Sequence, residues 1–95
     1  MQKYELMIIF DPSYDEEEAS KQLDKYFAPI VADGGKVDDV NVWGKRRMAY
    51  EIQKHREGVY AVVKFTAKVA GMKELERVMR LQEDILRIKI LKNDE

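Results

Sequence analysis

Cationic side chains gather in one short stretch of the sequence. From residue 45 to residue 56 the chain carries five positive charges against one negative charge, although the whole protein has a net charge of −1. The five cations are Lys45, Arg46, Arg47, Lys54 and Arg56. Such a local cluster is typical of a surface that binds a polyanion such as nucleic acid. Cations that protect a solvated edge strand from aggregation would produce the same pattern.

Other residues that could perform chemistry are few. The chain has no cysteine, which excludes disulfides, thiolate catalysis and cysteine zinc sites. Its only histidine, His55, lies beside Arg56 in a segment that we expect to be a loop. No converging set of metal ligands and no glycine-rich phosphate loop is evident. We therefore expect no cofactor, no metal site, no small-molecule substrate and no enzymatic activity.

The residues around the cluster predict a strand. Met48, Tyr50 and Ile52 alternate with other residues at the period of two that a strand shows. Trp43 and Gly44 precede the cations, and a glycine inside a strand often marks a bulge, which changes the face to which later side chains point. Because adjacent strand residues point to opposite faces, Arg46 and Arg47 should have different neighbours.

Charge is divided unequally along the chain. Residues 11–39 contain nine acidic residues and three lysines, whereas residues 40–95 contain 13 cations and eight acidic residues. One face can therefore repel polyanions while another attracts them. The 95 residues contain no apolar run of the roughly 20 residues that a membrane span needs and no signal-peptide pattern, and we expect one cytoplasmic domain.

Six elements are predicted in the order strand, helix, strand, strand, helix, strand. The first strand covers residues 3–10 and ends before Pro12; a capping box from Ser13 to Glu16 starts a helix over residues 15–32, which Gly34 and Gly35 terminate. The second strand runs from Val37 into the basic stretch, a loop covers residues 54–58, and the third strand covers residues 59–67. A second helix follows around Leu75, and residues 85–91 form the last strand, with residues 92–95 as a frayed tail.

This order predicts an α+β fold, the ferredoxin-like βαββαβ arrangement, with a four-stranded antiparallel sheet and both helices on one face, over residues 1–95. One core should lie between sheet and helices. Its expected members include Val40, Val63, Phe65, Leu75, Met79 and Ile88. The other face has no helix to cover it, and Met7, Ile9 and Val62 should lie there beside Lys64, Arg87 and Lys89. A partly apolar, partly cationic open face is a candidate interaction surface.

The motifs resemble a known family. The run from Trp43 to Lys54, W-G-K-R-R-M-A-Y-E-I-Q-K, together with the segments Met1–Glu5 and Glu83–Arg87, is similar to the bacterial small-subunit ribosomal protein S-six family (bS6). The similarity covers essentially the whole chain. It implies the ferredoxin-like fold, no enzymatic activity, and binding to the central domain of 16S ribosomal RNA as a heterodimer with ribosomal protein S-eighteen (bS18).

The charge and apolar patterns of the sequence, taken together with the resemblance, predict two sets of site residues. The RNA-binding set is Lys3, Lys45, Arg46, Arg47, Lys54, Arg56 and Arg87; the partner-binding set is Trp43, Met48 and Tyr50. Two departures concern these sets. Members commonly have arginine where this chain has Gln2 or Lys3, and proline where it has Glu51, which adds a negative charge near the cations. Many members also continue into a long polar tail, whose contacts are not transferred here.

Two other classes of protein share the predicted fold. A ferredoxin-like regulatory module would dimerise through its open sheet and bind a small ligand, and its stability would depend on that ligand. A small enzyme on the same scaffold would need catalytic groups that this sequence lacks. RNA affinity that falls steeply with salt concentration would favour the ribosomal class.

Overall fold

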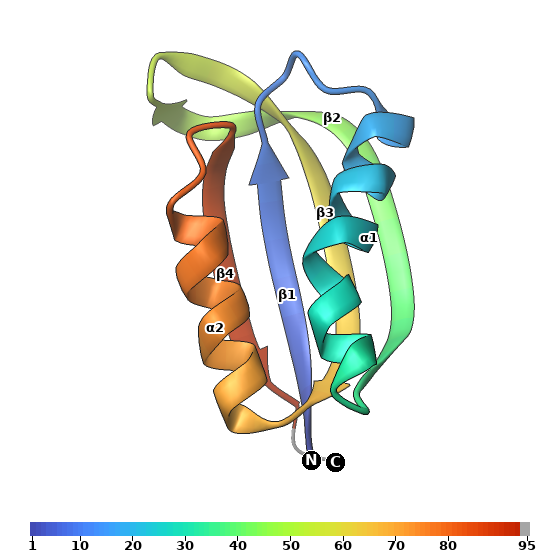
Figure 1. Cartoon of the computed structure of the whole chain (residues 1–95). Helices are drawn as coiled ribbons and strands as arrows, with labels where there is room; N and C mark the ends of the chain where they lie inside the picture. Colours follow the sequence, from blue (N-terminus) through green and yellow to red (C-terminus); the bar gives the residue numbers. More distant parts are fainter. Residues whose placement is uncertain (94–95) are drawn as a thin grey trace.

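The chain folds as a four-stranded antiparallel sheet with two helices on one face, in a computed structural model that describes residues 1–93 (Figure 1). The elements are β1 (Gln2–Phe10), α1 (Glu16–Ala32), β2 (Lys36–Ile52), β3 (His55–Ala67), α2 (Val69–Arg80) and β4 (Ile85–Lys92). The strand order is β2-β3-β1-β4, so β1 and β3 are central and β2 and β4 are edges. The predicted ferredoxin-like fold is confirmed.

The two central strands bury one side chain in every two, as their alternation predicts. Tyr4, Leu6 and Ile8 of β1 lie opposite Phe65, Val63 and Ala61 of β3. All six are buried, and they form the centre of the core with apolar residues from both helices. The helices contribute Ala19, Leu23, Phe27, Ile30, Leu75 and Met79. Of the predicted core residues, Val63, Phe65, Leu75, Met79 and Ile88 are confirmed.

Val40 is the exception to the predicted core. It pairs with the fully buried Val63, yet its own side chain is 43% exposed. Since β2 is an edge strand, it has a neighbouring strand on one side only, and its outer flank is open to solvent.

The start of α1 differs from the predicted capping box. The helix begins at Glu16, and the carboxylate of Asp15, rather than the hydroxyl of Ser13, accepts the N–H of Glu18 at 2.7 Å. Ser13 is held in the preceding turn because its N–H donates to Asp11 Oδ1 at 2.9 Å. The predicted glycine cap at the other end is confirmed: Gly34 has φ +90°, and Gly35 N–H donates to Ile30 O at 2.9 Å.

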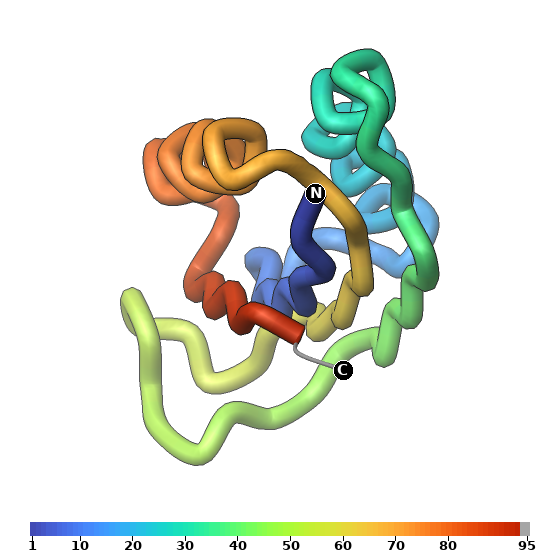
Figure 2. Tube along the Cα trace, turned by 90° about the horizontal axis from the view of Figure 1, so that it is seen from below, coloured from blue at the N-terminus to red at the C-terminus, as the bar shows by residue number. Residues whose placement is uncertain are grey.

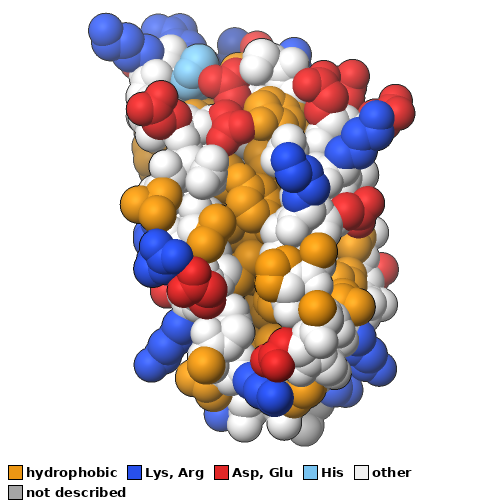
Figure 3. Space-filling model, viewed as in Figure 1, with side chains coloured by type: hydrophobic (Ala, Val, Ile, Leu, Met, Phe, Trp, Pro, Cys, Tyr) orange, Lys and Arg blue, Asp and Glu red, His pale blue; other side chains and the backbone are white. Residues whose placement is uncertain are grey.

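A groove of about 300 Å³ runs between the two helices on the outer side of the molecule. Figure 3 shows apolar side chains lengthwise along this line between α1 and α2. Tyr26 and Ile30 of α1 and Leu75 of α2 line the groove, and Gly71 leaves one wall without a side chain. The lack of a side chain at Gly71 therefore contributes to the width of the groove.

The β2–β3 connection is shorter than predicted. Instead of a loop over residues 54–58, a two-residue turn joins the strands, with Ile52 paired to His55. Gln53 and Lys54 have φ of +50° and +68°, and positive φ at both central residues is what a tight type I′ hairpin requires. Glycine and asparagine usually occupy these positions, and neither is present here.

The outer part of this hairpin, residues 45–58, extends past the end of β1 and is called the basic hairpin below. β1 pairs with β3 only as far as Phe10 and Val59, so β3 residues 55–58 pair with β2 alone. Figure 2 shows the basic hairpin, in yellow-green, curving across the face of the sheet away from the helices. A second apolar cluster of Ile9, Met48, Leu86, Ile52 and Tyr60 forms beneath it. The open face is therefore partly covered by the chain itself, and Ile9 is buried rather than exposed.

The two ends of the described chain lie together, at the end of the sheet opposite the basic hairpin (Figure 1). β4 includes Lys92, and Asn93 N–H donates to Lys3 O at 2.8 Å, so the predicted frayed tail does not begin at residue 92. Residues 94–95 of that tail lie outside the described residues. Neither helix of residues 1–93 has the length and hydrophobicity needed to cross a membrane.

Candidate nucleic-acid interface

The three consecutive cations lie in β2 where the basic hairpin begins. Lys45, Arg46 and Arg47 pair with Val59, Gly58 and Glu57 in an unbroken register. Consecutive residues of a paired strand point to opposite faces, so Arg46 and Arg47 project on opposite sides of the hairpin. Gly44, with φ +83°, occupies the bulge just before them, as the sequence indicates.

The cations of the predicted RNA-binding set are all exposed. In residues 1–93 none of the seven forms a salt bridge with an acidic side chain. Arg46 donates only a long bond to the neighbouring Lys45 O at 3.4 Å, and Arg87 donates to the hydroxyl of Tyr50. Their positive charges are therefore not neutralised within the described part of the chain and are available to an external anion.

The structure separates one member of this set from the others. Lys3 pairs with Thr66 near the start of β1, whereas the basic hairpin lies beyond Phe10 at the other end. Seven residues of extended strand span roughly 23 Å. Arg87 is brought close by its bond to Tyr50, although β4 and β2 lie at opposite edges of the sheet. One cluster thus contains six of the predicted cations, and Lys3 lies apart.

The three residues of the predicted partner-binding set have different surroundings. Trp43 is 42% exposed, with its ring parallel to that of Tyr60 at a centroid distance of 6.5 Å. Tyr50 is 59% exposed. Met48, in contrast, is only 8% exposed and packs against Ile9 and Leu86. Our expectation that Met48 lies on the partner-facing surface is wrong, because the hairpin folds this side chain inward.

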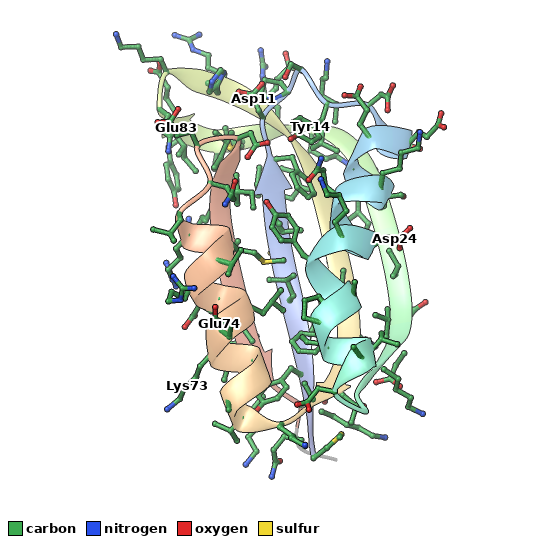
Figure 4. All side chains as sticks on the ribbon, in the orientation of Figure 1. Asp11, Tyr14, Asp24, Lys73, Glu74 and Glu83 are labelled. Atoms are coloured by element: carbon green, nitrogen blue, oxygen red, sulfur yellow. The ribbon has the colours of Figure 1, made fainter. Side chains whose placement is uncertain are left out.

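A polar network that sequence reasoning missed fixes the root of the basic hairpin. His55 Nε2 lies 3.3 Å from Asp11 Oδ2, which ties the first residue of β3 to the loop after β1. Asp11 N–H donates to Asp84 O at 2.9 Å, and the hydroxyl of Tyr14 donates to the Asp84 carboxylate. Figure 4 shows Asp11 and Tyr14 at the same end of the molecule as Glu83, while Asp24, Lys73 and Glu74 lie along the helices. Only the Asp-Pro turn signal at residues 11–12 marked this place in the sequence.

The network shifts two ionisation equilibria. Backbone and side-chain hydrogen bonds from Ser13, and then the charge of His55, hold the pKa of Asp11 below its ordinary value of 3.8. The hydrogen bond to Asp84, followed by burial, raises the pKa of Tyr14, so its hydroxyl stays protonated and continues to donate. Both shifts favour the observed arrangement at neutral pH.

Gly58 allows the basic hairpin to lie against the sheet. A Cβ atom at this position would be 2.4 Å from Ile9 Cγ2 and 3.1 Å from Phe10 O. Any side chain would therefore force β3 away from β1 at the point where the hairpin begins. The close approach explains a glycine that we had assigned to the end of a loop.

Comparison with known proteins settles the family. A family model described as "Ribosomal protein S6" matches residues 3–92. The chain belongs to the ribosomal protein S6 family. The resemblance drawn from the Trp43–Lys54 motif is thereby confirmed.

Curated bS6 proteins match over the full length of the chain. A relative from Rhodococcus opacus, "Small ribosomal subunit protein bS6", is 50% identical over 95 residues and is covered completely, as is this chain. A bS6 protein from Leifsonia xyli is 48% identical over the whole chain, which spans 74% of that relative. The chain is thus similar to small-subunit ribosomal proteins along its entire sequence.

Solved structures agree with this relationship. Ribosomal protein S6 of Thermotoga maritima superposes with a TM-score of 0.82 at 34% identity, over 97% of this chain and 87% of that one. The C-terminal domain of the MgtC protein from Mycobacterium tuberculosis superposes with a TM-score of 0.62 at 10% identity, over 100% of this chain and 90% of that one. The second likeness shows only that the fold also occurs outside the S6 family.

No group of three or more metal-ligating side chains converges anywhere in residues 1–93 of this bS6-family chain. The features that stand out are a projecting cationic hairpin and apolar residues on the sheet face beside it. This arrangement suits the binding of an anionic partner.

Proposed function

We propose that this chain is a structural constituent of the small ribosomal subunit that binds the central domain of 16S ribosomal RNA together with bS18. As a component of bacterial ribosomes it would act in the cytoplasm, and its role would be binding, not catalysis. The observation that carries the proposal is the basic hairpin, whose cations Lys45, Arg46, Arg47, Lys54 and Arg56 are exposed and form no salt bridge within residues 1–93.

The cluster supports phosphate contacts in particular. Arginine and lysine side chains neutralise backbone phosphates and release condensed counterions, which makes affinity fall as salt rises. Phosphate contacts position a protein on RNA without reading its sequence. Six cations at one end of a chain with net charge −1 give a local attraction of limited extent.

Because the attraction of this cluster for RNA is limited in extent, the proposal includes a second protein. Trp43, Met7 and Leu91 expose apolar surface, and all three lie on strands whose outer face no helix covers. A protein partner that buries this surface would place its own RNA contacts beside the basic hairpin. Linked binding of two modest surfaces raises the apparent affinity without any new contact.

A titration of a central-domain RNA fragment tests the proposal. The fragment is mixed with this chain, with bS18, and with both proteins at a fixed salt concentration. We expect weak binding by each protein alone and much tighter binding by the pair, with a steep loss of affinity as salt increases. Equal affinity for the RNA with and without bS18 would refute the partner role. Absence of RNA binding by the pair would refute the function.

A further inference from the structure

A polar hollow of about 400 Å³ lies at the irregular part of the basic hairpin. It is lined by Arg47, Met48, Ala49, Tyr50, Glu51 and Arg56, and is called the notch below. The β2–β3 register passes from Arg47 and Glu57 directly to Ile52 and His55, so residues 48–51 stand opposite Arg56 alone. Of these four residues Met48 turns inward and the other three are exposed. The notch lies at this irregularity of the strand pairing.

The charge of the notch favours an anion. Arg47 from β2 and Arg56 from β3 line it from the two strands, and both are exposed. Within residues 1–93, Glu51 is the one acidic residue of the lining, so the net charge of the described lining residues is positive. Guanidinium groups match the geometry of phosphate oxygens and can bind them through two parallel hydrogen bonds.

Tyr50 adds an oriented aromatic surface to the same site. The residue is 59% exposed, and its hydroxyl accepts a hydrogen bond from the guanidinium of Arg87 on β4. This bond restricts the ring while leaving its surface open. Exposed rings of this kind stack on nucleobases that are not already stacked inside a helix.

We infer that the notch binds one unpaired nucleotide of RNA, such as a bulged or loop nucleotide. Its phosphate contacts Arg47 and Arg56, and its base stacks on Tyr50. The volume lies within the range of about 300–1,000 Å³ that is usual for small-ligand sites. The inference rests on the proposed RNA-binding function, and it assigns Tyr50 to RNA rather than to a protein partner.

The test uses a stem-loop RNA with one bulged 2-aminopurine and a matched stem-loop in which every stem nucleotide is paired. We expect this chain, with its protein partner present, to bind the bulged RNA more tightly and to change the fluorescence of 2-aminopurine on stacking. Tyr50→Ala should remove the fluorescence change and weaken binding to the bulged RNA by roughly 5- to 150-fold. Tyr50→Phe, which retains the ring, should keep the fluorescence change.

Two charge variants complete the test. Arg56→Gln should weaken binding to both RNAs and reduce the slope of log affinity against log salt by about one. Glu51→Gln should tighten binding, because it removes a negative charge from the lining. Inorganic phosphate at matched ionic strength should not compete, since it lacks a base to stack on Tyr50.

Two outcomes for Tyr50→Ala would refute the inference and leave the proposed function standing. In the first, Tyr50→Ala leaves binding to the bulged RNA unchanged while Arg56→Gln weakens it. In the second, Tyr50→Ala weakens only the contact with bS18. Effective competition by inorganic phosphate would show a simple anion site. Loss of RNA binding by the unmodified pair would instead refute the function itself. Circular dichroism of each variant shows whether a loss of affinity is due to unfolding.

Discussion

Arg46 and Arg47 are neighbours in β2 whose side chains lie on opposite faces of the strand. The two side chains have the same charge, and their residues pair with Gly58 and Glu57 in one continuous register. They nevertheless face opposite sides of β2. Arg47 lines the notch, and Arg46 does not.

We predict that Arg46→Ala and Arg47→Ala affect RNA binding differently. The variant that loses a phosphate contact should bind more weakly to RNAs of any sequence and should reduce the salt slope by about one. The other should change affinity little. Binding is measured at fixed salt with bS18 present. If neither variant changes the affinity, the prediction that these two arginines have different roles in RNA binding fails.

Asp11 predicts a specific acid dependence of stability. Because the folded-state pKa of its carboxyl lies below 3.8, the charged form stabilises the fold above that pH, and the contribution disappears as the pH falls through the folded-state pKa. The difference in free energy of unfolding between the wild type and Asp11→Asn should therefore be constant above about pH 5 and shrink toward pH 2. Urea melts at several pH values measure it.

His55→Gln serves as a companion variant for this acid dependence. The main cause of the pKa shift is hydrogen bonding from Ser13, with His55 a smaller contribution. Most of the pH dependence should therefore remain in His55→Gln. A difference between wild type and Asp11→Asn that does not vary between pH 5 and pH 2 would contradict the assignment.

Strand β1 and residues 59–67 of β3 were predictable because each buries one face against the helices. Alternation at period two follows directly from that geometry, and their register and core side chains agree with it. The outer part of β2 was not predictable in this way. The hairpin folds over Ile9 and Leu86, which alternation alone does not reveal, and Met48 turns inward against them.

Turn chemistry explains the other error in the same hairpin. A two-residue turn is usually recognised by asparagine or glycine, and here Gln53 and Lys54 adopt positive φ without either. The polar run Lys54–Gly58 suggested a loop, although Gly58 is in fact buried beneath Ile9. Pairing with β2 over this run outweighed the local signal.

The fit of the basic hairpin against β1 gives a prediction at Gly58. Gly58→Ala should cost roughly 1–3 kcal/mol of unfolding free energy, because its Cβ meets Ile9 and the backbone of Phe10. Gly71→Ala in α2 is the matched control: nothing lies within 4 Å of its Cβ, so the better helix former should stabilise by up to about 1 kcal/mol. Denaturant unfolding measures both. Equal effects of the two substitutions would refute the proposed close approach.

The whole molecule relies on one main core between a four-stranded sheet and two helices. The family motif and the apolar pattern sufficed to predict this arrangement, since the two helices and the two central strands each show a clear period. The motif did not reveal that the basic hairpin folds back to build a second cluster. The second cluster forms where the basic hairpin lies over Ile9 and Leu86, and its members do not follow one regular sequence period.

Substitution of Leu75 tests how α2 packs against the main core. It is 5% exposed and belongs to the cluster that joins α2 to the sheet. Leu75→Ala should cost roughly 2–5 kcal/mol, a large share of the stability of a domain this small. Val40→Ala, at an exposed edge position, should cost much less. Chemical unfolding that finds less than about 1 kcal/mol for Leu75→Ala would show that α2 packs differently.

Trp43 has an optical consequence. It is the only tryptophan in the sequence, it is partly open to solvent, and its ring lies parallel to that of Tyr60 where the basic hairpin leaves the sheet. Indole emission depends on solvent contact, and the tryptophan fluorescence of the unlabelled chain comes from this one place. A blue shift on addition of bS18 would report burial of Trp43, and a change on addition of RNA alone would report movement of the hairpin.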